Sequence, residues 1–414
     1  MELSQRQTEV LRHSASDATS VFAGGAVRSG KSYSVMLGFA LWLLKEDTSS
    51  DHAIVGQSIE TIMRNVGFDL LTTIEQMGGR AEVSKTFGTR IVVQGKVPQN
   101  VWLIGANDAK ARRRIQGSTL KGLVVEELAL LPEDFFQMAW SRLSVEGAKM
   151  WCSYNPEGPA HWAKRTVIDR AREYGGVVIR FYMKDNPTLS AAVIARYEKS
   201  FTGHFYKRLI EGQWAAATGA CYPEWFTTPH DMETQNVGLA LDWGVSTTLA
   251  CLAIQQDREK AVVARELFHH AKETQVLTEN QAAELVIAWW TAHYGSLFKG
   301  PRAFAWLDPN TPASFKGLLR KAGFQIRGAD NAVIPGIITT GARLASGQIL
   351  IHERVTELAD ELASYTWDAA ASDKGEDKPT KKSDHGCDAL RYFAHTTGKA
   401  WRAMQMPKVN EVLR

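Results

Sequence analysis

The chain contains 414 residues, of which 44% are hydrophobic and 22% charged, a composition typical of a globular protein long enough for two domains. It has no run of about 18 apolar residues, so no membrane-spanning helix is expected, and its N-terminus lacks the layout of a signal peptide. The net charge of +3 is too small to indicate a nucleic-acid partner. The four cysteines are widely spaced, which argues against zinc and disulfide frameworks and favours a cytoplasmic protein.

The first 184 residues alternate between strand-like and helical patterns. Helical patterns at residues 30–44, 59–77 and 161–172 lie between short apolar runs. This alternation predicts an α/β domain with a mostly parallel sheet. The predicted strands are Thr19–Ala23, His52–Val55, Arg90–Val93, Val101–Ile104, Leu123–Val125, Lys149–Tyr154 and Gly176–Phe181.

The rest of the chain has a different organisation. Residues 185–235 are less regular and turn-rich, which predicts a linker, and residues 236–414 form a second patterned region. This region begins with three strand-like runs and continues with alternating helices and strands, the order of the ribonuclease-H-like nuclease fold. The three runs are Val237–Trp243, Thr248–Ile254 and Ala261–Leu267.

A phosphate-binding loop follows the first predicted strand. The segment from Gly25 to Ser32 satisfies GxxxxGK[ST], with Gly30 and Lys31 in their required places, and it opens a helix. Glycines let backbone amides face phosphate oxygens, and the helix N-terminus favours an anion. Lys31 supplies a positive charge to the β- and γ-phosphates of ATP, and the Ser32 hydroxyl is a ligand for Mg²⁺. The sequence therefore predicts an ATP site.

A second nucleotide motif is predicted about 90 residues further on. The apolar run that starts at Leu123 reads as a buried strand ending in two carboxylates, Glu126 and Glu127. In a P-loop ATPase of the ASCE type, one such carboxylate holds Mg²⁺ and the next activates water. We assign the first role to Glu126 and the second to Glu127. A surface pair of glutamates at a strand end is the alternative.

Phosphoryl transfer also requires an arginine that neutralises charge on the transferred group. Arg28 lies inside the phosphate-binding loop, and Arg112, Arg113 and Arg114 form a cluster. One of the clustered arginines would contact a neighbouring subunit's nucleotide or DNA phosphates. A helix face exposed only to solvent is an equally good interpretation of the cluster. The pattern does not choose between Arg28 and the cluster.

Acidic residues in the second region end apolar runs. Asp242 and Asp308 each follow such a run, and a carboxylate buried there must be paired, exposed or bound to metal. Asp384 and Asp388 are four residues apart and share a helix face, with His385 between them. If the strands are neighbours, Asp242, Asp308 and Asp388 converge.

Such a cluster of carboxylates predicts a nuclease. It would hold two Mg²⁺ or Mn²⁺ ions about 3.5–4 Å apart, one activating water and the other stabilising the leaving oxygen. His385 would orient a ligand, position water or contact the scissile phosphate. Asp384 is assigned either an outer supporting role or a helix cap.

Taken together, these motifs resemble the phage terminase large subunits, in particular the branch found in PBSX-like prophages. The likeness covers nearly the whole chain, and one departure from it is Glu126, where the family usually has Asp. The segments that carry it are Gly24–Ser32, Asn155–Trp162, Asp185–Pro187, Gly212–Trp214 and Asp384–Tyr392.

The resemblance implies an ATP-driven motor that packages double-stranded DNA into procapsids and an endonuclease that cuts concatemers. It implies that Gln7 contacts adenine and that Asn155 belongs to a segment coupling hydrolysis to DNA movement. The implied partners are DNA of any sequence, a small terminase subunit, the portal protein and further copies of the chain in a ring of five. The implied location is the cytoplasm of the infected bacterium and transiently the procapsid portal, not the mature virion.

Two other functions fit parts of the pattern. A helicase or ATP-driven recombination enzyme with a nuclease tail would share the phosphate-binding loop and the carboxylates, but would not explain the Asn155–Trp162 segment beside Asp185–Pro187. A decayed prophage protein that binds phosphate or capsids without catalysis is the second alternative, and the intact Lys31 and Asp242 argue against it.

Overall fold

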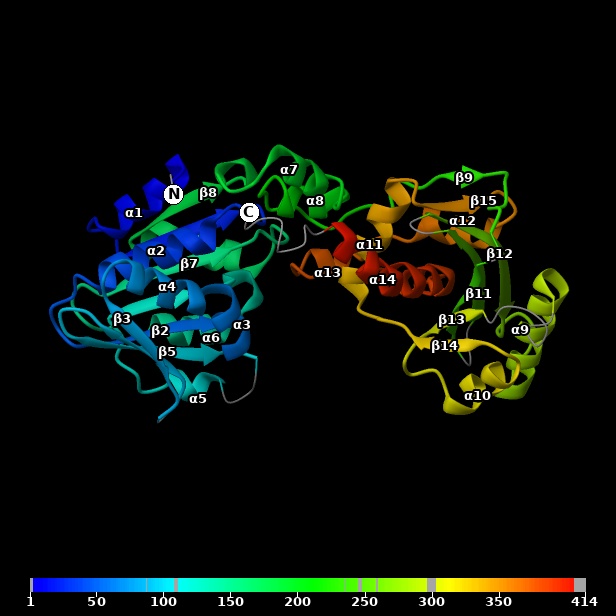
Figure 1. The fold of residues 1–414 in the computed structure, drawn as a ribbon, viewed down its shortest axis with the longest axis horizontal. Coiled ribbons are helices and arrows are strands. Elements are labelled where there is room, and N and C mark those ends of the chain that lie inside the picture. The colour runs from blue at the N-terminus through cyan, green and yellow to red at the C-terminus, as the bar shows by residue number, and fades with distance from the viewer. Residues whose placement is uncertain are drawn as a thin grey trace. The chain divides into compact units, whose positions relative to one another are not determined.

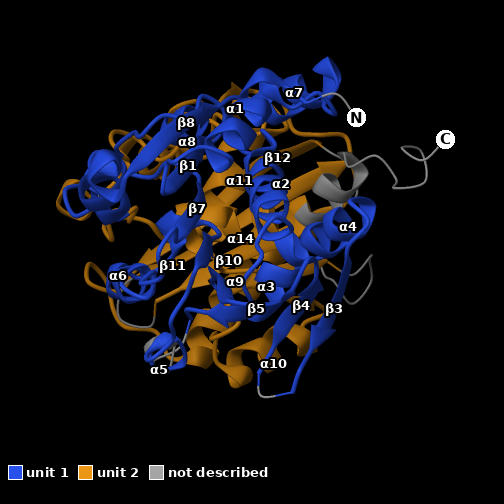
Figure 2. Cartoon of the chain, turned by 90° about the vertical axis from the view of Figure 1, so that its left-hand side faces the viewer, with its two compact units in different colours: residues 1–198, 204–216, 372–376 blue, residues 199–203, 217–371, 377–414 orange. Residues whose placement is uncertain are grey.

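The chain folds into two compact units in the computed structural model (Figure 2). The first unit comprises residues 1–198, 204–216 and 372–376, and the second comprises residues 199–203, 217–371 and 377–414. Most of the segment from 185 to 216 therefore packs with the first unit. The structure describes residues 3–86, 88–107, 111–234, 236–244, 248–257, 260–295 and 303–405.

An eight-stranded sheet forms the centre of the first unit (Figure 1). Six neighbouring strands, from β5 to β8 in the sheet, are parallel, and β3 and β4 extend the sheet as antiparallel strands. The predicted mostly parallel α/β sheet is confirmed. In sheet order the strands are β3 (Arg80–Ser84), β4 (Arg90–Gln94), β5 (Pro98–Gly105), β2 (Asp51–Gly56), β6 (Gly122–Val125), β7 (Lys149–Tyr154), β1 (Ser20–Gly25) and β8 (Gly176–Phe181).

Helices cover both faces of this sheet, because successive strand residues point to opposite sides. Val21 belongs to one buried cluster, together with residues of α1, α2 and α4, whereas Phe22 belongs to the other cluster, together with residues of α6. The helices of this part of the chain are α1 (Gln5–Ser14), α2 (Lys31–Leu43), α3 (Ile59–Ile62), α4 (Phe68–Gln76), α5 (Ala111–Ile115), α6 (Glu133–Trp140), α7 (Ala191–Glu198) and α8 (Gly203–Leu209).

Two predicted helices of the first unit are wrong in detail. The helix expected over residues 59–77 is interrupted by a π-helical turn at Met63–Gly67. A Cβ atom at Gly67 would lie 2.6 Å from the Met63 sulfur, so the absence of a side chain permits this turn. The helix expected over 161–172 is a π-helix at Ala163–Ile168 followed by a 3₁₀ turn.

The second unit is built on a seven-stranded mixed sheet. β10, β11 and β12 are antiparallel neighbours, while β13 pairs parallel with β10 and β15 pairs parallel with β12. In sheet order the strands are β14 (Gln325–Gly328), β13 (Phe304–Leu307), β10 (Val237–Trp243), β11 (Thr248–Asp257), β12 (Lys260–His270), β15 (Ile349–His352) and β9 (Thr227–Thr228).

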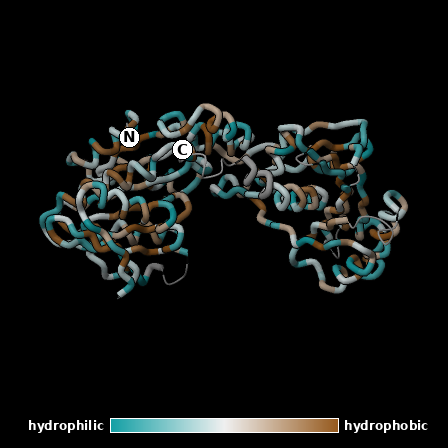
Figure 3. The backbone as a smooth tube through the Cα atoms, in the orientation of Figure 1, coloured by the Kyte–Doolittle hydropathy of each residue, from teal (hydrophilic) through white to brown (hydrophobic). Residues whose placement is uncertain are grey.

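Helices also pack on this second sheet. Side chains of α9 and α10 share a buried cluster with β10, β11 and β13, and α14 packs against the same three strands and against α11. Figure 3 shows hydrophobic and hydrophilic stretches alternating along the chain in both units, and no described helix is long and apolar enough to cross a membrane. The helices are α9 (Glu279–Tyr294), α10 (Ala313–Lys321), α11 (Val333–Ala345), α12 (Thr356–Ser364), α13 (Ala369–Ser372) and α14 (His385–Gln405).

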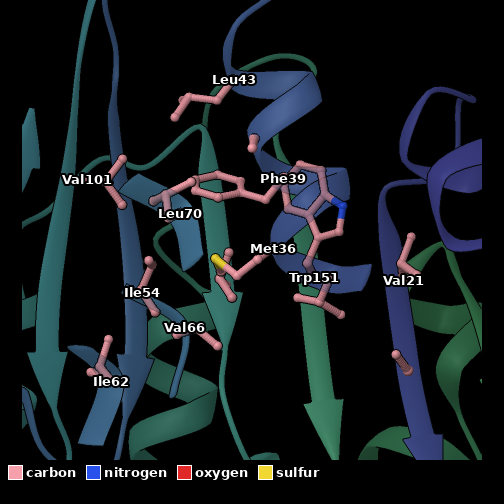
Figure 4. Packing of buried hydrophobic residues seen from close by; sticks show 14 of the residues in the cluster. Val21, Met36, Phe39, Leu43, Ile54, Ile62, Val66, Leu70, Val101 and Trp151 are labelled. Carbon is pink, nitrogen blue, oxygen red and sulfur yellow. The ribbon is translucent and has the colours of Figure 1, made fainter. Parts of the chain in front are cut away.

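Aromatic rings hold α2 on the first sheet (Figure 4). The Phe39 ring on α2 is fully buried and meets the Trp151 ring on β7 edge to face, with their centroids 5.2 Å apart. Met36 and Leu70 belong to the same cluster. Because the phosphate-binding loop precedes α2, this packing fixes the direction in which the loop leaves β1.

We expect Phe39→Ala to lower the free energy of unfolding of the first unit by about 3–5 kcal/mol, because it leaves a cavity beneath α2. Thermal unfolding followed by calorimetry measures this loss. The matched control is Phe68→Ala, since Phe68 is 60% exposed and should change stability by less than about 1 kcal/mol. Equal losses of unfolding free energy in the two variants would show that the packing of α2 does not depend on the Phe39 ring.

Candidate functional site

Three neighbouring strands bring the predicted nucleotide residues to one edge of the first sheet. β1, β7 and β6 are adjacent and parallel, so their carboxyl ends lie at the same edge. Gly24 pairs with Tyr154, and Val125 pairs with Cys152. The phosphate-binding loop after β1, Asn155 after β7 and the two glutamates after β6 therefore meet there.

The backbone of the loop is shaped to face an anion. Gly25 and Gly30 have φ angles of 140° and 86°, and a Cβ atom at Gly25 would lie 2.1 Å from the Phe181 carbonyl oxygen. Arg28 also adopts a left-handed conformation, with φ 56°. No described group accepts a hydrogen bond from the amides of Arg28, Ser29 or Gly30. These amides and the N-terminus of α2 are available to phosphate oxygens.

Lys31 is buried in a chain of polar contacts. Its ammonium is directed at Asn155 Oδ1, 2.6 Å away, and at the Ala26 carbonyl oxygen, 3.3 Å away. The Asn155 amide in turn donates to Glu127 Oε2 at 3.2 Å. Burial lowers the pKa of Lys31, and the nearby carboxylates of Glu127 and Glu126 oppose that shift. Asn155 thus connects the lysine to the glutamate assigned to water activation.

Glu126 lies beside the second residue of α2. Ser32 Oγ donates to Glu126 Oε1 at 3.3 Å, and Ser153 Oγ donates to Glu126 Oε2. Burial and the neighbouring Glu127 raise the pKa of Glu126 to about 7. A hydroxyl and a carboxylate this close are the hard oxygen ligands that suit Mg²⁺, so the residues fit the predicted cation.

Glu127 follows in a conformation that side chains rarely adopt, with φ 56°. Its backbone amide donates to Ser153 Oγ at 3.2 Å, so one serine positions both glutamates. Ser153 was not among the predicted site residues. It lies two residues before Asn155 on β7 and so points to the same side of the sheet, a signal that the strand pattern contains.

The remaining nucleotide-site candidates lie around this edge. Gln7 is buried, its Oε1 accepts the Ser4 amide, and its Nε2 lies 2.9 Å from where a Gly30 Cβ would be. Arg28 does not contact the carboxylates, because its Nε donates to the Tyr197 hydroxyl on α7 at 3.2 Å.

The arginine cluster lies on α5. Arg113 and Arg114 are exposed, and Arg114 donates to the Gly105 carbonyl oxygen at 2.6 Å. The side chain of Arg112 lies outside the described residues. The geometry therefore brings neither Arg28 nor the two described cluster residues onto Lys31 or Glu126.

The second group of candidates meets in the second unit. β10 and β13 are parallel neighbours in which Leu241 pairs with Leu307, so the next residues, Asp242 and Asp308, are level with each other. The Tyr392 hydroxyl lies 3.1 Å from Asp242 Oδ1 and 3.0 Å from Asp308 Oδ2. Two strands and one helix thus bring the two carboxylates to a single phenol.

One face of α14 supplies the other contacts. His385 Nδ1 lies 2.6 Å from Asp242 Oδ2, and this hydrogen bond raises the pKa of His385 although burial opposes the shift. Burial would raise the pKa of Asp308, but hydrogen bonds from the Asn310 amide, Asn331 and Tyr392 outweigh it and lower that pKa. Burial raises the pKa of Tyr392. His385 and Tyr392 are seven residues apart, two helical turns, and therefore face the same way.

Asp388 is engaged differently from the other two aspartates. Arg391 donates to Asp388 Oδ1 from Nε at 3.1 Å and from Nη2 at 2.7 Å. Burial raises the pKa of Asp388, and Arg391 opposes the shift. The Lys381 ammonium lies 3.3 Å from Asp384 Oδ2 and 3.9 Å from Asp388 Oδ2. Asp384 and Asp388 therefore share a lysine, whereas Asp242 and Asp308 share a tyrosine.

Comparisons with known proteins agree on one family. Residues 17–209 match the family Terminase_3, described as phage terminase large subunit. The large terminase of a thermophilic bacteriophage is 29% identical with a TM-score of 0.79, over 96% of this chain and 99% of that one. The chain is thus similar to the phage terminase large subunits in the matched segment and in its fold over nearly the whole length.

Nucleotide complexes of the same relative also match this chain. The thermophilic phage's large terminase in complex with ADP is 29% identical with a TM-score of 0.77, over 95% of this chain and 99% of that one. Its complex with ATP-γ-S is 28% identical with a TM-score of 0.77 over the same shares. No curated protein matches the sequence.

The sequence predicts divalent metals at the second site. Among the described residues, no group of three or more histidine, cysteine, aspartate or glutamate side chains is arranged to hold a metal ion. The donor set nevertheless fits a hard cation, because oxygen atoms of the Asp242 and Asp308 carboxylates both lie within hydrogen-bond distance of one phenolic oxygen. The single hydroxyl hydrogen of Tyr392 fully satisfies only one of them, and Asn331 donates to Asp308 Oδ2 at 3.1 Å.

Three residues of the second site were not predicted. Tyr392 was part of the quoted motif without a role, and its spacing of four from Asp388 places it on the same helix face. Arg391 lies within the same motif, but nothing in the sequence pairs it with Asp388 rather than with solvent. Asn331 donates to Asp308 Oδ2 at 3.1 Å from a loop 23 residues away, and no local pattern predicts that contact.

The raised pKa of Glu126 makes stability depend on pH. Because the pKa of Glu126 is raised from about 4.5 in the unfolded chain to about 7 in the folded one, its contribution to stability falls as pH rises through that window. Glu126→Gln removes this loss. We expect the variant to gain up to about 3 kcal/mol over the wild type near pH 8, and much less near pH 5, without nucleotide or metal.

Calorimetry of the first unit's transition at the two pH values measures this gain. The control is Glu60→Gln, because Glu60 is exposed and its replacement should act alike at both values. A gain for Glu126→Gln that does not grow with pH would contradict the burial argument.

Proposed function

We propose that this terminase is an ATP-hydrolysing motor that packages double-stranded DNA and a metal-dependent endonuclease that cuts concatemers. The observation that carries the motor is the convergence of Lys31, Ser32, Asn155, Glu126 and Glu127 at one sheet edge. The thermophilic phage relative has been solved with ADP and with ATP-γ-S, which supports a nucleotide at the matching place.

The residues of the motor site divide the work between binding and hydrolysis. The free loop amides and Lys31 would bind the phosphates of ATP, while Ser32 and Glu126 would hold Mg²⁺. Mg²⁺ supplies charge neutralisation to the phosphate oxygens. Glu127 would orient and deprotonate water, and Gln7 would contact adenine.

Asn155 links binding to hydrolysis in this proposal. The Lys31 ammonium is directed at Asn155 Oδ1, and phosphate oxygens would compete for that ammonium. Release of Asn155 changes its contact with Glu127, so binding of the γ-phosphate would alter the hydrogen bonding of the water-activating carboxylate. The geometry thereby supports the coupling role that the sequence assigns to this segment.

The arginine that stabilises phosphoryl transfer remains a choice between Arg28 and Arg112, Arg113 and Arg114. The position of Arg28 within the loop supports it, provided that its side chain leaves the Tyr197 hydroxyl. The exposure of Arg113 and Arg114 supports a contact with a neighbouring subunit or DNA instead.

The second unit would be a ribonuclease-H-like nuclease. Three antiparallel strands, β10 to β12, followed by β13 beside β10, support that fold. Asp242 and Asp308 would hold the divalent metals, with the outer oxygen of Asp388 as a third ligand, and those ions would supply an activated water and charge neutralisation. His385 would orient Asp242, and Asp384 would hold Lys381 beside the site.

The proposed partners follow from the motor. The terminase would grip DNA through its phosphates, independently of sequence, because a translocase must hold every sequence it meets. It would act with a small terminase subunit, a portal protein and other copies of itself in a ring of five, in the host cytoplasm and at the procapsid. The domains would be 1–184 for the motor, 185–235 for the connection and 236–414 for the nuclease, in a member of the PBSX-like branch.

The first test measures two activities in two variants. We expect Asp242→Ala to abolish Mn²⁺- or Mg²⁺-dependent cleavage of plasmid DNA while leaving ATP hydrolysis intact. Lys31→Ala should lower ATP hydrolysis by about 100-fold or more and leave cleavage intact. The exposed residues Asp257 and Lys45, changed to alanine, are the matched controls. A wild type that does not cut, or an Asp242→Ala variant that cuts normally, would remove the nuclease from the proposal.

The second test separates nucleotide binding from hydrolysis. Glu127→Gln keeps the size of the side chain but removes its ability to accept a proton from water. We expect Mg²⁺-ATP to bind with unchanged affinity and the turnover rate to fall by about 100-fold or more. The exposed Glu133→Gln is the control. If Glu127→Gln turns over ATP at the wild-type rate, another group activates the water.

A further inference from the structure

We propose that Tyr392 is a positioning residue that sets the geometry of the Asp242 and Asp308 carboxylates and thereby the affinity of this site for a divalent cation. The inference rests on the proposed nuclease and adds to it a residue that touches neither the metal nor DNA. Its observation is the position of one phenolic oxygen 3.1 Å from Asp242 Oδ1 and 3.0 Å from Asp308 Oδ2.

The chemistry of a phenol makes this contact informative. Tyrosine has one hydroxyl hydrogen, so it fully satisfies one carboxylate oxygen at a time. The second oxygen then needs another donor, and Asn331 Nδ2 supplies one to Asp308 Oδ2 at 3.1 Å, which allows the hydroxyl to donate to Asp242 Oδ1. The arrangement therefore lowers the cost of bringing a divalent cation between Asp242 and Asp308, since the carboxylates are already held together.

The surroundings of Tyr392 keep its hydroxyl in place. The side chain is 4% exposed, and the Arg391 guanidinium lies 5.0 Å from the centroid of the tyrosine ring. The same guanidinium donates to Asp388 Oδ1 at 2.7 Å and to the Asn331 carbonyl oxygen at 2.8 Å. The helix itself packs against β10 and β13, the strands that lead to the two aspartates.

Each aspartate is also fixed from its other side, so the tyrosine acts on oriented groups. Asp242 Oδ2 is engaged by His385, and Asp308 Oδ1 accepts the Asn310 amide at 2.7 Å. The oxygen atoms that meet the phenol are Asp242 Oδ1 and Asp308 Oδ2, and Asp308 Oδ2 also accepts a hydrogen bond from Asn331 Nδ2 at 3.1 Å. Removing the hydroxyl takes away the contact that the two carboxylates share, while the hydrogen bonds from His385, Asn310 and Asn331 remain.

The test is Tyr392→Phe in the full chain, with Mn²⁺ binding measured by calorimetry without DNA. We expect Mn²⁺ to bind about 10–100-fold more weakly than to the wild type, as for other groups that orient metal ligands. The half-maximal Mn²⁺ concentration for plasmid cleavage should rise by the same factor, with the rate at saturating Mn²⁺ largely restored. Tyr222→Phe is the matched control, because Tyr222 is 1% exposed and its hydroxyl has no described partner.

The outcomes distinguish this inference from the nuclease proposal. If the wild type cuts DNA and Tyr392→Phe binds Mn²⁺ as tightly as it does, the positioning role is wrong and the nuclease stands. A Tyr392→Phe variant that loses cleavage at every Mn²⁺ concentration, with a lower melting temperature and unchanged Mn²⁺ affinity, would show packing instead and overturn the inference. A wild type that neither binds Mn²⁺ nor cuts overturns the nuclease and the inference with it.

Discussion

A buried lysine ammonium must be matched by oxygen atoms, and this constraint organises the first unit. Lys31 is 5% exposed, and its nearest oxygen atoms come from Asn155 and the backbone of its own loop. Those partners are available only because β1 and β7 are parallel neighbours that end at the same edge. The aromatic packing of Phe39 on Trp151 holds α2, the helix that begins with Lys31, on the sheet. The oxygen partners that the site needs for Lys31 are therefore supplied by the strand order of the fold.

The second unit, by contrast, brings negatively charged side chains together. Asp242 and Asp308 are level on neighbouring strands, and neither lies beside a lysine or arginine that the structure describes as its ion-pair partner. Their neighbours are the neutral hydroxyl of Tyr392 and His385, whose raised pKa favours its charged form. Asp388, by contrast, is paired with Arg391. Asp242 and Asp308 are thus available to a bound cation, whereas Asp388 is paired with the guanidinium of Arg391.

The sequence predicts the strands better than the contacts between their ends. Seven apolar runs in the first unit and the three that open the second correspond to strands, because runs of apolar residues between turns have few other structures. β3, with an exposed and polar pattern, and the four-residue β14 lack that signal. The π-turn at Met63–Gly67 was also missed, since it depends on how a side chain packs at Gly67. Register and loop contacts, such as Asn331 with Asp308, arise from tertiary folding.

The contacts of motif residues are predictable when the backbone positions the side chain. They are less predictable when a long, flexible side chain reaches more than one partner. Glu126, Glu127 and Asn155 follow parallel strands, so their meeting with Lys31 follows from topology. Arg28 follows the same strand, yet its long side chain reaches Tyr197 instead. A flexible arginine in a left-handed loop residue can serve either the nucleotide or α7, and the two positions exclude each other. The observed hydrogen bond to the Tyr197 hydroxyl therefore depends on the length and flexibility of the Arg28 side chain, which the strand order does not specify.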